Sequence, residues 1–126
     1  MTVASAPIEL LVVDGNTDLA ESVQLLLQTR GWVVHVALDA ATAIALLEQH
    51  PIALAFIAIA LPDVDGYTLA RRLSAAQRRC VLIALTGYGH AADRRRALEA
   101  GFDDHVLKPA TLAQLEAVVT RYVRSP

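Results

Sequence analysis

Side chains that could hold a metal ion or an anion follow several apolar runs of this chain. Asp14 comes directly after the first run, Thr86 after the fourth and Lys108 after the fifth. They offer a carboxylate, a hydroxyl and an ammonium, groups that bind cations or phosphoryl-like anions. Ala58 follows the third run, and its methyl group neither accepts a phosphoryl group nor binds a metal. The sequence therefore predicts a polar pocket with an inert side chain at one of its positions.

The pocket is predicted because apolar runs alternate with amphipathic helical patterns along the chain. Asp39 and the capping-box pair Thr111 and Gln114 can open helices, and Gly31 can end one in a left-handed conformation. Five strand–helix repeats imply a doubly wound α/β fold with a parallel sheet and helices on both faces. Ligands bind such sheets at the carboxyl ends of the strands, where the residues above would converge. Strands are expected over 8–13, 32–37, 52–57, 80–85 and 104–107, and helices over 19–30, 40–49, 66–76, 91–100 and 112–122.

Composition fits one small soluble domain. The chain has 126 residues, of which 55% are hydrophobic, enough for a single core that we expect over 8–123, with short tails at 1–7 and 124–126. A formal net charge of −2 gives no electrostatic footprint for nucleic acid or for an anionic membrane. The lone Cys80 excludes an intramolecular disulfide, and no secretory n-region or apolar stretch of about 18 residues is present. We expect a cytoplasmic domain.

Three loop segments resemble those of the receiver domains of two-component response regulators and hybrid histidine kinases. They are Leu61–Tyr67, Ala84–Gly87 and Val106–Pro109, and the resemblance extends from Leu10 to about Val119. It implies a flavodoxin-like five-stranded sheet in the order 2-1-3-4-5 and a role in phosphorelay signal transduction. Several loops match in order, which is more specific than any single motif.

The resemblance also assigns roles to the pocket residues. Asp14 stands at the first of two adjacent acids, and Gly15 replaces the second, which is the usual Mg²⁺ ligand. Ala58 replaces the phosphoacceptor aspartate, whereas Thr86 and Lys108 keep the hydroxyl and ammonium that contact the phosphoryl group. We therefore expect a degenerate, non-enzymatic receiver with no cofactor and weak or absent Mg²⁺ binding. We also predict that Lys108 pairs with Asp14, because a semi-buried ammonium needs an anion.

A partner surface is predicted around the fourth helix and fifth strand. The resemblance places Tyr88, His105 and the basic run Arg94, Arg95 and Arg96 on the face that receivers use for contact with a histidine kinase, a regulator or an output domain. The basic run suggests an acidic partner. A solvated helical face is the simpler interpretation of such a run.

Two other functions remain open at this stage. The chain could be a conventional phosphoacceptor that uses Asp63, Asp65 or Asp14, although the first two are typical turn and helix-capping residues. Alternatively, Lys108, Thr86 and backbone N–H groups could hold a small anion. A metal site is not expected elsewhere, because His35, His50 and His90 lie far apart in the predicted pattern.

Overall fold

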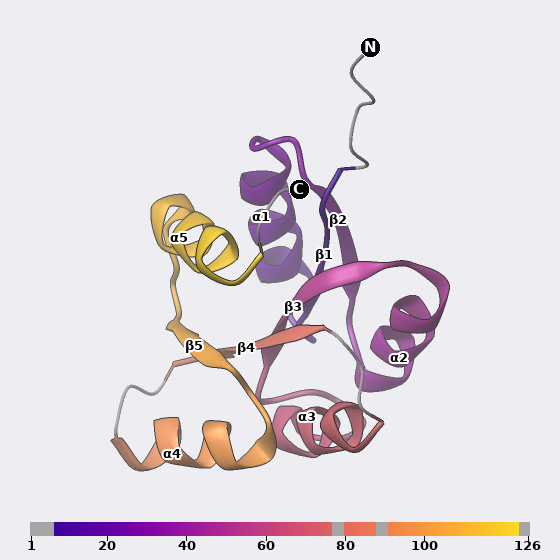
Figure 1. Ribbon diagram of the computed structural model, residues 1–126, viewed down its shortest axis with the longest axis vertical. Helices are drawn as coiled ribbons and strands as arrows, with labels where there is room; N and C mark the ends of the chain where they lie inside the picture. Colours follow the sequence, from indigo (N-terminus) through magenta and orange to yellow (C-terminus); the bar gives the residue numbers. More distant parts are fainter. Residues whose placement is uncertain (1–6, 77–79, 88–90, 124–126) are drawn as a thin grey trace.

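The computed structural model describes residues 7–76, 80–87 and 91–123 and contains a single parallel five-stranded sheet (Figure 1). The strand order is β2-β1-β3-β4-β5, as predicted. The strands are β1 (Glu9–Val13), β2 (Val33–Ala37), β3 (Ile52–Ala58), β4 (Val81–Thr86) and β5 (Asp104–Leu107), and the helices are α1 (Thr17–Gln28), α2 (Ala40–Gln49), α3 (Gly66–Ala75), α4 (Ala91–Ala100) and α5 (Leu112–Tyr122).

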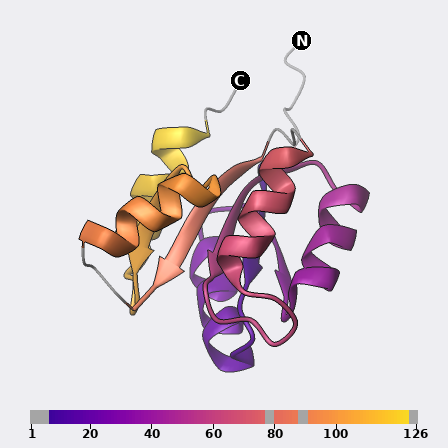
Figure 2. The ribbon, with the colours of Figure 1, turned by 90° about the horizontal axis from the view of Figure 1, so that it is seen from below.

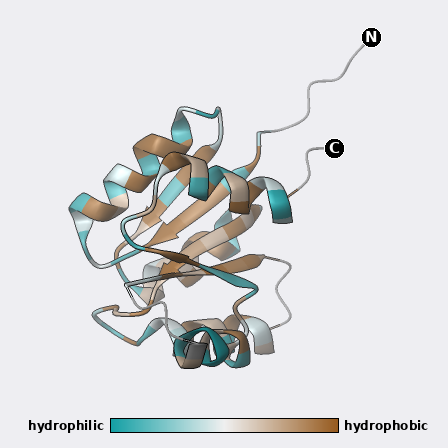
Figure 3. Ribbon diagram, turned by 90° about the vertical axis from the view of Figure 1, so that its left-hand side faces the viewer, coloured by the Kyte–Doolittle hydropathy of each residue, from teal (hydrophilic) through white to brown (hydrophobic). Residues whose placement is uncertain are grey.

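Two hydrophobic layers separate the sheet from its helices. One layer packs α2, α3 and α4 against one face, and the other packs α1 and α5 against the opposite face. Figure 2 shows α4, α3 and α2 in a row across the near face. The strands are mostly hydrophobic along their length, whereas the helices carry both polar and apolar residues (Figure 3). This pattern is expected when both faces of a parallel sheet are covered.

The helix caps follow the predicted chemistry. The Asp39 carboxylate accepts a hydrogen bond from the Thr42 N–H at 2.7 Å, and Thr111 and Gln114 form the predicted capping box. Gly31 has the predicted left-handed conformation, with a φ of 82°, but α1 ends earlier than predicted, at Gln28 with Thr29 as its C-cap. The caps of Asp39 and Thr111 fix where α2 and α5 begin.

The structure places α1 over Thr17–Gln28, two residues earlier than predicted, and moves several strand ends by one residue, of which two bear on the pocket. β3 includes Ala58 and β4 includes Thr86, so both residues are the last of their strands and do not lie in the loops beyond. Their side chains are therefore held by the sheet pairing, in which Ala58 lies opposite Leu85. Within the described residues, no helix is both long and apolar enough to cross a membrane.

Candidate functional site

The predicted pocket forms at the carboxyl ends of the strands. Asp14 is only 3% exposed, and its Oδ2 accepts a hydrogen bond from the Lys108 Nζ at 2.8 Å. The prediction that these two residues pair is confirmed. The pair joins the loop after β1 to the loop after β5, which are 94 residues apart in sequence.

Backbone hydrogen bonds hold both charged residues in place. The Asp14 N–H donates to the carbonyl of Ala37 at 3.0 Å, and the Asn16 N–H donates to the Asp14 Oδ1 at 2.9 Å. On the other side of the pocket, the Lys108 N–H donates to the carbonyl of Thr86 at 2.9 Å. Thr86 itself is buried. Both carboxylate oxygens of Asp14 therefore have a donor, as a buried charge requires.

Ala58, the last residue of β3, is buried, with 1% of its surface exposed. Gly66, the first residue of α3, packs directly over it: a Cβ on Gly66 would meet the Ala58 carbonyl oxygen and would lie 2.9 Å from the Ile59 Cα. The Gly66 N–H also donates to the carbonyl of Ile59 at 2.7 Å. A neighbouring open cleft of about 420 Å³ is lined by Ile59, Ala60, Leu85, Thr86, Gly87 and Lys108.

Gly15 is exposed and contributes no side chain to the pocket. A Cβ at this position would lie 3.3 Å from the Pro62 Cδ and 3.6 Å from the Leu38 carbonyl oxygen. Its backbone conformation is accessible to other residues, so a carboxylate could be introduced here if the Pro62 ring moved by a few tenths of an ångström.

The loop acids Asp63 and Asp65 are helix caps. The Asp65 carboxylate accepts the Thr68 N–H at the start of α3. The Asp63 carboxylate accepts the N–H groups of Ala40 and Ala41, both at 3.0 Å, and so caps α2 across the loop. The Ala40 hydrogen bond, together with those from Ala41 and Val64, lowers the pKa of Asp63 from 3.8 to about 2. Sequence reasoning placed Asp63 in a turn but missed its contact with α2.

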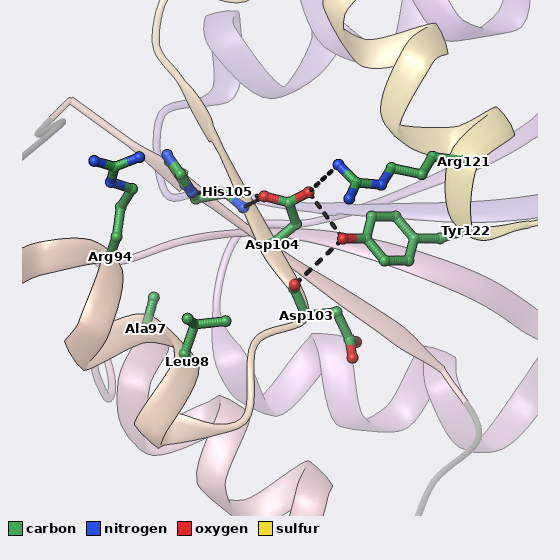
Figure 4. A pocket seen from close by; sticks show the side chains of 8 residues that line it. All are labelled: Arg94, Ala97, Leu98, Asp103, Asp104, His105, Arg121 and Tyr122. Carbon is green, nitrogen blue, oxygen red and sulfur yellow. Dashed lines mark hydrogen bonds and ion pairs between the residues drawn. The ribbon is translucent and has the colours of Figure 1, made fainter. Parts of the chain in front are cut away.

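A second cleft, of about 310 Å³, lies over β5 between α4 and α5 and is named here the α4–α5 cleft (Figure 4). The Tyr122 hydroxyl donates to the Asp104 Oδ2 at 2.9 Å, and the Arg121 Nη1 lies 3.6 Å from the same oxygen. Arg94 and His105 lie on the side of the cleft opposite α5. Burial, followed by the hydrogen bond to Asp104, raises the pKa of Tyr122.

The predicted partner surface is only partly assembled. Arg94 and His105 line the same cleft, whereas the Arg96 guanidinium lies 4.3 Å above the ring of Tyr67 in α3. The basic run is therefore not one surface, because successive residues of a helix point in directions about 100° apart. Arg95 is exposed, and Tyr88 lies outside the described residues. The contacts of Asp104 with Arg121 and Tyr122 were not predicted from the sequence. Tyr122 was assigned only to the apolar stripe of the last helix, which gives no signal for a hydrogen bond by its hydroxyl.

The expectation that the histidines lie far apart is wrong for two of them. His35 in β2 and His50 after α2 stack, with ring centroids 4.1 Å apart. The His35 Nε2 lies 2.9 Å from the Glu9 Oε1, and the His50 Nδ1 lies 3.9 Å from the same oxygen. The strand pairing of β1 with β2 and β3 brings together residues that are distant in sequence. His90 lies outside the described residues.

Comparisons with known proteins agree with this architecture. The chain is 34% identical over 119 residues to an "uncharacterized 14.6 kDa protein in sodA1 3′ region" of Leptolyngbya boryana, covering 93% of this chain and 91% of that protein. It is 33% identical over 120 residues to the regulatory protein VanRc of Enterococcus gallinarum, covering 92% of this chain but only 52% of VanRc. The chain thus spans about half the length of that regulator.

Solved structures show the same fold. A two-component response regulator from Clostridium difficile matches with a TM-score of 0.87 and 27% identity, covering 93% of this chain and 96% of that one. A chemotaxis protein of Vibrio cholerae at 18% identity has a TM-score of 0.88, covering 94% of this chain and all of that one. The family model of the response regulator receiver domain matches residues 10–120. On this match and on the relatives above, the chain belongs to the response regulator receiver domain family of two-component signalling.

Proposed function

We propose that this receiver domain works through protein–protein contact and accepts no phosphoryl group at the end of β3. The observation that carries the proposal is the pairing of Lys108 with the buried Asp14 at 2.8 Å, together with the buried Ala58 as the last residue of β3. In the family, the residue at this place is the acceptor aspartate, and the lysine contacts the phosphoryl group. Here the lysine already has a buried carboxylate partner.

Charge balance supports this proposal. A receiver pocket with three carboxylates and one ammonium has a formal charge of about −2, which a bound divalent cation offsets. In this chain the pocket contains Asp14 and Lys108, whose charges cancel without a metal. Buried charges that pair with each other need no further counterion.

The residues present do not fit the Mg²⁺ site of the family. Mg²⁺ takes octahedral oxygen ligands and usually needs one or two carboxylates. Asp14 is the one acid retained at the positions of the family's metal ligands, and its two oxygens already accept hydrogen bonds from Lys108 and Asn16. Gly15 and Ala58 offer no side-chain oxygen. We therefore propose that Mg²⁺ binds weakly or not at all, and no step of the function is assigned to it.

The proposed contact surface is the α4–α5 cleft with the exposed side chains of Leu98 and Leu107 beside it. Asp104 engages Tyr122 and Arg121, and Arg94 is the exposed cation of α4 that lines the cleft. Apolar side chains beside a positively charged group suit a partner that presents an apolar patch flanked by an acid. The proposed partner is a signalling protein such as a histidine kinase, a regulator or an output domain.

A substitute phosphoacceptor receives less support. Asp63 and Asp65 hold the first turns of α2 and α3, so phosphorylation of either would break a cap. Asp14 is buried and paired. The small-anion alternative is also less favoured, because the Lys108 ammonium that would hold the anion already contacts Asp14.

Phosphoryl uptake tests the proposal. The wild type, Ala58→Asp, Gly15→Asp and the double variant are incubated with acetyl phosphate and Mg²⁺, and intact mass is measured. We expect no uptake by the wild type and little by either single variant, because each lacks one of the two acids of the family site. The double variant should bind Mg²⁺ and take up phosphate if the Pro62 ring makes room for the new side chain at position 15.

Two controls make the outcome interpretable. Beryllium fluoride with Mg²⁺ should leave the amide NMR spectrum of the wild type unchanged and should shift resonances near Thr86 in the double variant. Uptake by the wild type equal to that of the double variant would overturn the proposal, and Asp63→Asn and Asp65→Asn would then locate the substitute acceptor.

A further inference from the structure

We propose that Glu9, His35 and His50 form a binding site for a divalent transition-metal ion of the zinc class. One ligand atom from each side chain lies within 4.8 Å of the other two. The three residues come from separate parts of the chain: Glu9 begins β1, His35 is in the middle of β2, and His50 follows α2. The proposal is independent of the pocket at the other end of the sheet.

The fold places the three side chains on one face of the sheet. Leu11, two residues after Glu9, pairs with His35 in the sheet register, so Glu9 and His35 are diagonal neighbours that point to the α2 side. The His50 N–H donates to the carbonyl of Leu46, and the His50 carbonyl accepts the Ile52 N–H, both at 2.9 Å. These backbone bonds hold His50 at the junction of α2 and β3, above the other two residues.

The ligand atoms are close to the spacing that a tetrahedral ion requires. Zinc binds nitrogen at about 2.0–2.1 Å and carboxylate oxygen at about 2.0–2.2 Å, so adjacent ligand atoms should lie roughly 3.3 Å apart. The observed distances from the Glu9 Oε1 are 2.9 Å to the His35 Nε2 and 3.9 Å to the His50 Nδ1. Shifts of less than an ångström would equalise these two distances, and the ligand atoms of the two histidines lie within 4.8 Å of each other.

The environment allows this adjustment. The two imidazole planes are tilted by 25°, so a rotation of one ring can direct both nitrogens at a common point. The His50 side chain is 37% exposed, whereas those of His35 and Glu9 are more buried, so His50 is the ring with solvent beside it. Exposure also leaves a fourth coordination position open to water, as in zinc sites with two histidines and one glutamate.

The ligand set selects the class of metal. Imidazole nitrogen suits zinc, copper, nickel and iron, whereas Mg²⁺ and Ca²⁺ take oxygen ligands. Two imidazoles and one carboxylate therefore favour zinc-class ions. An ion at this place would join β1, β2 and the α2–β3 junction, about 16 Å along β1 from Asp14. It would bind the folded state only, because the unfolded chain does not bring these residues together.

Calorimetric titration of the tag-free, EDTA-treated chain with ZnCl₂ tests the site. We expect one ion per chain and a Zn²⁺-dependent rise in the melting temperature. His35→Gln, His50→Gln and Glu9→Gln should each weaken binding at least about ten-fold, since even residues that only orient a ligand cost that much when changed. Co²⁺ should give the visible absorption of a tetrahedral site, and this absorption should be lost in the same variants.

Matched controls identify binding elsewhere on the chain. His105 lies beside a carboxylate, with its Nδ1 3.6 Å from the Asp104 Oδ1, but its pocket contributes no second histidine. His105→Gln and Cys80→Ser should leave the affinity unchanged. Circular dichroism is measured for each variant to check that it is folded. The proposal is overturned if Zn²⁺ does not bind, or if binding survives in the three ligand variants and is lost in either control.

Discussion

Removing the Lys108 ammonium should destabilise the fold, because it leaves the buried Asp14 carboxylate without its counter-charge. In Lys108→Met the apolar stem is retained and the charge is lost. Breaking a fully buried pair by removing one partner costs about 3–5 kcal/mol. The Asp14 side chain is 5% exposed, but that of Lys108 is 29% exposed, so water can enter and the Asn16 N–H remains. We therefore expect a loss of about 2–3 kcal/mol.

The assay is equilibrium denaturation by urea, supported by thermal melting. For a domain of this size, 1 kcal/mol changes the melting temperature by about 4 °C, so the expected decrease is about 8–12 °C. The matched control is Arg30→Met, which breaks the ion pair between Arg30 and Glu116. Their side chains are 49% and 37% exposed, respectively. Exposed pairs contribute at most about 1 kcal/mol, so this variant should be close to the wild type.

A double-mutant cycle with Asp14→Asn isolates the interaction. An asparagine can still accept the Asn16 N–H but carries no charge, so Lys108→Met should cost less in its presence than in the wild type. A coupling free energy near zero, or a Lys108→Met protein as stable as the wild type, would refute the electrostatic reasoning. It would also remove the main support for a pocket that is complete without a metal.

Two further predictions concern the loop after β3. Gly66→Ala should lower the free energy of unfolding by about 1–3 kcal/mol, because the added methyl group meets the Ala58 backbone. The control Gly87→Ala has open space around the new methyl group and should cost less than about 1 kcal/mol. Urea denaturation measures both variants. Asp63→Asn should destabilise the domain at neutral pH, and the difference from the wild type should shrink as pH falls from about 4 towards 2. The sign follows from a folded pKa of about 2, below the ordinary 3.8: the charged form caps Ala40, and this stabilisation is lost on protonation. Melting curves of both proteins across this pH range measure the effect. A difference in stability between Asp63→Asn and the wild type that does not change with pH would contradict the prediction.

Local patterns were sufficient to predict the helices, the strands and the parallel α/β class, whereas the strand order was implied by the resemblance to receiver domains. The helix over 40–49 and the capping box at Thr111 were predicted correctly because the period of the apolar residues and the cap chemistry are set by neighbouring residues. The pairing of Lys108 with Asp14 was also predictable, since a parallel sheet brings its carboxyl ends together and a buried ammonium needs a partner.

Contacts that depend on the direction of a side chain across the fold were not predictable. Asp63 caps a helix that begins 23 residues earlier, and Arg96 turns towards an aromatic ring in the preceding helix. The cluster of Glu9, His35 and His50 requires the strand register and the position of the α2–β3 junction together. Spacing along the chain carries no signal for such a cluster, because each residue belongs to a different element.

The small side chain at position 58 bears directly on how the pocket is closed. In the sheet, β3 and β4 separate β1 from β5, yet the Lys108 Nζ after β5 lies 2.8 Å from the Asp14 Oδ2 after β1. Ala58 and Thr86 are the last residues of the two strands between them. An aspartate at position 58 would add a second buried carboxylate that competes with Asp14 for the one ammonium. The methyl group therefore lets a single ion pair tie the first strand to the last, and a domain closed in this way would present its α4–α5 cleft in one arrangement until a partner binds.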